Sequence, residues 1–273
     1  MTLRIVSLTT IPSRFNSIGP TLKSLLRQRD ALDEIRLYIP RFYRRFPNYD
    51  GHIPEIPEGV TVVRTEEDLG PASKILFAVK DFGATEAQIL FCDDDRIYPP
   101  NWAQALFETQ NDRPQECVAM IGRVIRPDLG VTSTFTPKAE VAHVRALRSR
   151  GLRALSRLSA LIGLRTIKTK PVISPGYVDI LQGLGGAVVR PEFFDARAFQ
   201  IPDVLWAVDD FWLSGMLALK GIPIYLPEGL ELPDTTDAHR SDPLFKAVID
   251  GVDRVEANKQ CVQYMQRTFG VWM

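Results

Sequence analysis

The sequence has few cysteines and no net charge. Its three cysteines, Cys92, Cys117 and Cys261, are far apart and form no CxxC pair, which argues against a disulfide framework and the common zinc motifs. A reduced, cytoplasmic compartment is therefore expected. Lysine plus arginine and aspartate plus glutamate each number 33, so no overall field attracts the chain to nucleic acid.

The sequence also lacks the segments that insert proteins into membranes. No apolar run reaches the roughly 20 residues of a membrane-spanning helix, and the first residues lack the apolar core of a signal peptide. We therefore expect any membrane contact to be peripheral. With 45% hydrophobic and 24% charged residues among 273, the composition is that of a globular protein with a sizeable core.

Short apolar runs alternate with longer amphipathic stretches along most of the chain. We expect strands at 3–8, 34–39, 60–64, 89–92, 118–125, 187–190 and 222–226, and helices at 20–28, 72–82, from 101, at 209–220 and at 250–269. This order predicts an α/β fold with a mostly parallel sheet and helices on both faces. No linker or internal repeat is present, so we expect one domain over residues 1–273.

Three consecutive carboxylates, Asp93, Asp94 and Asp95, directly follow the buried strand expected at 89–92. They repel one another and resist desolvation unless a cation neutralises them. Carboxylate oxygens suit Mg²⁺ and Mn²⁺, and the carboxyl ends of strands in open α/β sheets are where ligands bind. A polar turn that caps the next helix is the simpler alternative. We favour metal-assisted chemistry on a phosphate-bearing substrate.

A second acidic pair, Asp209 and Asp210, opens a predicted helix. One aspartate would suffice to cap the helix and complement its dipole. Two carboxylates with Trp206, Phe211 and Trp212 around them indicate the wall of a pocket instead. Apolar surroundings and a neighbouring acid raise a carboxyl pKa, which is what a general base at neutral pH requires.

Three further features have both a structural and a functional interpretation. The glycine-rich turn at 183–186 does not fit the dinucleotide fingerprint, so it either needs positive φ or lets a ligand approach the backbone. Lys74 begins a predicted helix after a Gly-Pro turn, where it is either a surface charge or a ligand-binding cation. His239, one of three histidines, is either structural or a metal ligand.

One segment departs from the even charge distribution of the chain. Residues 141–178 contain no acid, and eight basic residues lie between 141 and 170. Apolar residues fall on one side of a helical projection and Arg150, Arg153 and Arg157 on the other, which predicts a basic amphipathic helical insertion at about 141–175. This helix either packs on the domain or attaches peripherally to the anionic inner face of a membrane.

In this order, the motifs resemble those of GT-A fold glycosyltransferases, with the closest resemblance to family 2-like bacterial members. The similarity covers about residues 3–240. It is carried by the N-terminal strand and loop at 6–14, a turn towards the nucleotide at 68–74, a DxD pattern at 93–95, a loop beside the donor sugar at 185–194 and an acidic pair at 208–212.

The resemblance implies a GT-A type, Rossmann-like sheet and transfer of a sugar from a nucleoside diphosphate to a hydroxyl group, with inversion. It implies a UDP-sugar as the expected donor, Mn²⁺ or Mg²⁺ as the cofactor, and a carbohydrate or lipid-linked acceptor of bacterial polysaccharide biosynthesis. The implied residues are Asp210 as the base with Asp209 as the alternative, Asp95, Asp93 and His239 for the metal, and Thr9, Thr10, Arg14, Asp68, Lys74, Asp93, Asp94, Gly185 and Gly186 for the donor.

Departures from the family pattern and competing activities leave some points open. The helix after Asp210 lacks the QxxRW motif of processive synthases, which favours single additions, and an Asp-Asp pair replaces the usual Glu-Asp. A sugar-phosphate nucleotidyltransferase would carry a glycine-rich loop after its first strand, whereas residues 9–14 contain no glycine. A phosphohydrolase would carry DxDxT, which is missing here. Intact acids in both clusters argue against a non-catalytic nucleotide-binding protein.

Overall fold

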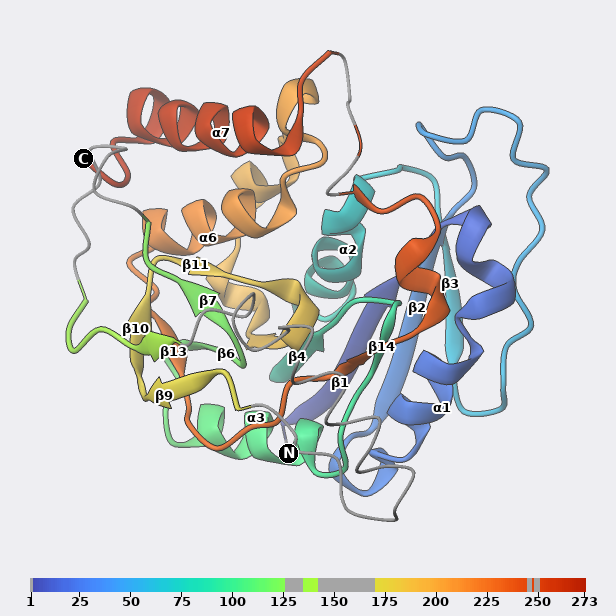
Figure 1. Ribbon diagram of the computed structural model, residues 1–273, viewed down its shortest axis with the longest axis horizontal. Helices are drawn as coiled ribbons and strands as arrows, with labels where there is room; N and C mark the ends of the chain where they lie inside the picture. The colour runs from blue at the N-terminus through green and yellow to red at the C-terminus, as the bar shows by residue number, and fades with distance from the viewer. Residues whose placement is uncertain (1, 126–134, 142–169, 245–246, 248–250) are drawn as a thin grey trace, which may run out of the picture.

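The computed structural model describes residues 2–125, 135–141, 170–244, 247 and 251–273. Its centre is an eight-stranded sheet in the order β10-β13-β6-β12-β4-β1-β2-β3 (Figure 1). Only β10 and β12 run antiparallel to their neighbours. The strands are β1 Leu3–Thr9, β2 Glu34–Pro40, β3 Thr61–Thr65, β4 Ala87–Phe91, β6 Cys117–Ala119, β10 Gly176–Val178, β12 Ala187–Val189 and β13 Ile224–Leu226.

Helices cover both faces of this sheet. Helices α1 (Gly19–Leu26) and α3 (Trp102–Asn111) pack on one face, and α2 (Ser73–Asp81), α6 (Asp209–Leu219) and α7 (Arg254–Phe269) form the core of the other. Strand β4 serves both cores, because Leu90 belongs to the first and Ile89 and Phe91 to the second. The predicted α/β class with a mostly parallel, doubly covered sheet is confirmed, and the architecture is consistent with the GT-A type.

Three short strand pairs lie outside the central sheet. They are β5 (Arg96–Ile97) with β14 (Asp234–Thr235), β7 (Gly122–Arg123) with β11 (Ile180–Leu181), and β8 (Glu140–Val141) with β9 (Val172–Ser174). The strand expected at 118–125 is therefore divided between β6 and β7. Helix α7 begins at Arg254 rather than at residue 250. The Asp253 side chain caps it there by accepting hydrogen bonds from the backbone amides of Val255 and Glu256.

Most of the predicted basic insertion falls on 142–169, outside the described residues. Its two described ends are extended rather than helical, since β8 pairs with β9. Among the described residues, no helix combines the length and the apolar character needed to cross a bilayer.

The strand register brings distant acidic and hydroxyl groups to one edge of the sheet. Strand β1 pairs in parallel with β4, so that Ser7 lies opposite Phe91. Thr10 therefore follows β1 at the same edge at which Asp93, Asp94 and Asp95 follow β4. The carboxyl edge of a parallel sheet is the place at which α/β proteins bind ligands.

Candidate functional site

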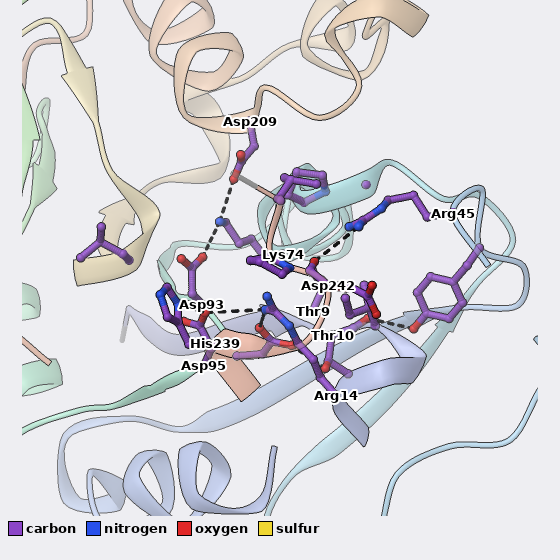
Figure 2. A pocket seen from close by; sticks show the side chains of 18 of the residues that line it. Thr9, Thr10, Arg14, Arg45, Lys74, Asp93, Asp95, Asp209, His239 and Asp242 are labelled. Carbon is purple, nitrogen blue, oxygen red and sulfur yellow. Dashed lines mark hydrogen bonds and ion pairs between the residues drawn. The ribbon is translucent and has the colours of Figure 1, made fainter. Parts of the chain in front are cut away.

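A cavity of about 260 Å³ opens at this edge of the sheet (Figure 2). Its walls come from the ends of β1 and β4, the first turns of α2 and α6, and the segment 239–244. The lining includes most of the residues predicted from the sequence, namely Thr9, Thr10, Arg14, Asp68, Lys74, Asp93, Asp94, Asp95, Asp209, Asp210 and His239. Residues more than two hundred positions apart in the sequence therefore line the same cavity.

Asp94 is held by groups from the first loop. Its Oδ2 accepts a hydrogen bond from Thr10 Oγ1 at 2.6 Å, and its Oδ1 forms an ion pair with Arg14. Thr21 Oγ1 also donates to the Asp94 backbone carbonyl at 2.9 Å. Burial alone would lower the pKa of Arg14, but the carboxylates of Asp94 and Asp95 outweigh this and raise it, so the guanidinium stays charged. Asp94 therefore anchors the loop after β1 to the acidic cluster.

Lys74 connects the two acidic clusters. Its buried ammonium donates to Asp93 Oδ1 at 2.7 Å and to Asp209 Oδ2 at 2.8 Å (Figure 2). Burial would lower the pKa of Lys74, yet Asp209 and Asp93 raise it well above its usual value. Lys74 is therefore a permanent buried cation. Its predicted contact with the donor stays a prediction.

The adjacent acids of α6 have opposite environments. Burial would raise the pKa of Asp209, but Lys74 and Arg254, whose Nη2 lies 3.3 Å from Asp209 Oδ1, lower it. Burial and the charge of Asp209 raise the pKa of Asp210 to about 6, against the influence of Lys74 and Arg254. Asp210 Oδ1 accepts a hydrogen bond from the Gly183 amide at 3.0 Å. One carboxylate is thus fixed as an anion and the other can exchange a proton near neutral pH.

Asp95, a predicted metal ligand, lies beside the predicted ligand His239. Its Oδ2 lies 3.0 Å from His239 Nδ1. Its buried Oδ1 makes no hydrogen bond, although Arg96 Nε lies 3.0 Å away. Within the described residues, no group of three or more His, Cys, Asp or Glu side chains is arranged to hold a metal. In the part of the chain that the structure describes, an ion at Asp95 and His239 would have to take its other ligands from phosphate and water, so the metal site stays a prediction.

Two predicted donor contacts use their polar side chains within the protein. Thr9 Oγ1 donates to the Tyr38 carbonyl of the neighbouring strand at 2.8 Å. The Asp68 carboxylate accepts from the backbone amides of Gly70 at 2.9 Å and Arg44 at 2.8 Å. Both residues nevertheless line the cavity.

The glycine-rich turn lines the cavity with Leu184, and none of its glycines is part of the wall. Gly185 and Gly186 are not part of the cavity wall; the Gly185 carbonyl accepts from Trp102 Nε1, and a Cβ at Gly186, whose φ is +85°, would lie 2.3 Å from the Trp102 ring. Gly183 faces the acids instead, and a Cβ there would lie 2.6 Å from Lys74 Nζ. The structure thus gives Gly185 and Gly186 a packing role and Gly183 the close approach.

Sequence reasoning also missed three cations of the cavity wall, Arg45, Arg96 and Arg254. Arg45 comes from the irregular loop after β2, donates to the Asp242 carbonyl at 3.4 Å and lies over the Phe46 ring, 5.7 Å from its centroid. Arg254 comes from the first turn of α7, where nothing in the local sequence distinguishes it from other surface arginines. Seven acidic residues line the cavity, and such a cluster needs cations nearby. Only the folded structure shows which arginines supply them.

Comparisons with known proteins add little to this geometry. No protein-family model and no curated protein matches the chain. Among the solved structures to which it is similar is S. aureus TarS 1-349, with 14% sequence identity and a TM-score of 0.45. The match covers 98% of this chain and 72% of that one. At this level the likeness concerns the outline of the fold and carries no argument about family or activity.

Proposed function

We propose that the protein is a metal-dependent glycosyltransferase that moves a sugar from a nucleoside-diphosphate donor to a hydroxyl acceptor with inversion. The observation that supports this most is that two acidic clusters, one after β4 and one at the start of α6, line the same cavity and have different charged neighbours. The cluster after β4 is suited to a diphosphate and its cation, and the pair on α6 contains a carboxylate with a pKa near 6.

The reaction follows from the position of Asp210. Its carboxylate takes the proton of the acceptor hydroxyl while that oxygen forms a bond to the anomeric carbon of the donor. The bond from this carbon to the diphosphate breaks, and its electron pair leaves with the nucleoside diphosphate. A single displacement inverts the anomeric configuration, and a base with a pKa of about 6 is largely ionised at neutral pH.

Positive side chains on the wall can bind the anionic donor. Arg45 and Arg14 point towards the cavity in Figure 2. Arg45 has fewer protein partners than Arg14, so it is freer to bind a ligand. Asp95 and His239 would hold a Mn²⁺ or Mg²⁺ ion together with oxygens of the donor. Such an ion, when bound, neutralises charge that develops on the leaving diphosphate. Phe46 and Tyr43 add aromatic surface against which a base can pack.

Titration with nucleoside diphosphates tests the donor half of this proposal. UDP, GDP, ADP and CDP are each titrated calorimetrically with and without Mn²⁺, and the preferred base then selects the sugar donors to assay. We expect one base to bind best and binding to strengthen with Mn²⁺. NMR of the product then reports the anomeric configuration.

The results that contradict the proposal are equally specific. Retention of configuration would reject the direct displacement but keep the transferase. Absence of binding to any nucleoside diphosphate, in protein that is folded by circular dichroism, would reject the function itself.

A further inference from the structure

Arg254 lies far from both acidic clusters in the sequence, yet its guanidinium reaches the α6 pair. It donates to the Ala207 carbonyl, just before α6, and lies 3.3 Å from Asp209 Oδ1. Its side chain is 20% exposed and that of Asp209 is 5% exposed, so water screens this contact only partly. A charge pair in such a place costs desolvation, which suggests a role beyond stability.

We propose that Arg254 is a positioning residue: together with Lys74 it fixes Asp209 as a buried anion, so that Asp210 is the carboxylate that takes the acceptor proton. This rests on the proposed function for the identity of the reaction, though the electrostatic arrangement stands on the geometry alone. Lys74 binds Asp209 Oδ2 and Arg254 faces Oδ1, so both oxygens of one acid are occupied by cations.

Asp210 has no such partner among the described residues. Its Oδ1 accepts from the Gly183 amide, and no cation forms an ion pair with it. Four charged groups act on it from neighbouring elements: Asp209 on α6, Lys74 on α2, Arg254 on α7 and Arg123 on β7. The Arg123 guanidinium lies over the Phe211 ring, 4.7 Å from its centroid. Asp210 can therefore change its protonation without breaking an ion pair.

The packing of α7 makes Arg254 a rigid support. Figure 1 shows α7 lying along α6, and Met265 is so close to Gly215 of α6 that a Cβ there would meet its Cε at 2.6 Å. Asp253 caps the first turn of α7 through the amides of Val255 and Glu256. Helix α7 thus packs on α6, and its first turn, which carries Arg254, is capped by Asp253.

The experiment removes the charge of Arg254 in one variant and keeps it in another. Arg254→Gln removes the charge but leaves an amide donor, and Arg254→Lys keeps the charge without the planar fork. Arg267→Ala is the matched control, because it removes an exposed arginine from the other end of the same helix. Thermal unfolding first verifies that each variant is folded.

Titration of the acids is followed by ¹³C NMR of carboxyl-labelled aspartates without added divalent ion, and Asp210→Asn identifies the signal of Asp210. This measurement does not depend on any activity. We expect Arg254→Gln to raise the Asp210 titration midpoint by about one pH unit, the low end of the effect of a nearby opposite charge. Arg254→Lys should largely restore it, and Arg267→Ala should leave it unchanged.

In the transferase assay, the acid limb of the pH profile of kcat should move by the same amount, with donor KM unchanged. A wild-type titration in folded Arg254→Gln would overturn the proposal. A raised donor KM with an unmoved acid limb would also overturn it and make Arg254 a diphosphate ligand. Loss of the proposed function alone would leave the NMR shift in place, so the two failures are distinguishable.

Discussion

The two acidic clusters face the same cavity but neutralise their charges in different ways. After β4, each carboxylate lies against a basic side chain: Asp93 against Lys74, which also binds Asp209, Asp94 against Arg14, and Asp95 against His239 and Arg96. At the start of α6, two cations serve one acid and leave the other with a raised pKa. The first arrangement places a basic group beside every acid, although burial still raises the pKa of Asp94. The second leaves Asp210 without an ion pair among the described residues, so that it can accept a proton. The same residue type thus has opposite roles because its neighbours differ.

The largest effect that separates the two members of the α6 pair is expected from Asp210→Asn. Loss of a general base typically costs about 10²–10⁴-fold in rate, so kcat should fall by this amount while donor affinity stays. Steady-state kinetics and calorimetry measure the two quantities. The matched variant is Asp209→Asn; if it abolishes turnover while Asp210→Asn does not, the roles of the pair are reversed.

Lys74→Met should break the connection between the clusters. Removal of one partner from a buried ion pair costs about 3–5 kcal/mol of unfolding free energy. We expect the lower end of this range, because buried Asp209 would keep Arg254 and the Asp93 that loses Lys74 is partly exposed. Chemical denaturation measures the change. Lys80→Met, an exposed position on the same helix, should stay within about 0.5 kcal/mol of the wild type. Equal stability of the two variants would show that Lys74 is dispensable to the network.

Asp95→Ala tests whether the β4 cluster binds a metal. We expect it to weaken the Mn²⁺-dependent affinity for a nucleoside diphosphate by at least the roughly 10–100-fold that loss of an outer-shell partner costs a metal site. Affinity without metal should change little. Asp112→Ala, an exposed acid beyond α3, is the control. A folded Asp95→Ala protein with full Mn²⁺ dependence would place the metal elsewhere.

The smallest effect expected is a pH dependence that belongs to the α6 pair alone. Turnover should fall about tenfold per pH unit below a pH of about 6, because protonated Asp210 cannot accept the acceptor proton. The free energy of unfolding should change with pH in the opposite direction to turnover. The folded pKa of Asp210 exceeds the unfolded value of about 4, so its contribution to stability decreases as pH rises from about 4 to about 6.

Thermal unfolding of the wild type and Asp210→Asn measures this second effect. The asparagine variant, which does not titrate, should gain stability relative to the wild type as pH rises through this window. A constant difference between the two proteins from pH 4 to 7 would mean that Asp210 has an ordinary pKa.

Local sequence patterns were enough to predict the elements that form the walls of the site. The apolar run before Asp93 predicted a buried strand because each of its residues faces a core on one side of the sheet or the other. The glycine run could not be resolved in the same way. Whether Gly183 or Gly186 faces the acids depends on where Trp102 and Lys74 lie, and both come from other elements.

The sequence by itself determined the α/β class, the carboxylates at the ends of strands and the acidic pair at the start of α6. These follow from hydrophobic periodicity and from the chemistry of neighbouring residues, which act over a few positions. Only the tertiary structure decided which acid pairs with which cation. Lys74 and Asp209 are 135 residues apart, and Arg254 reaches Asp209 from the last helix. Burial and nearby charge set a pKa, and both depend on spatial neighbours that no local pattern records.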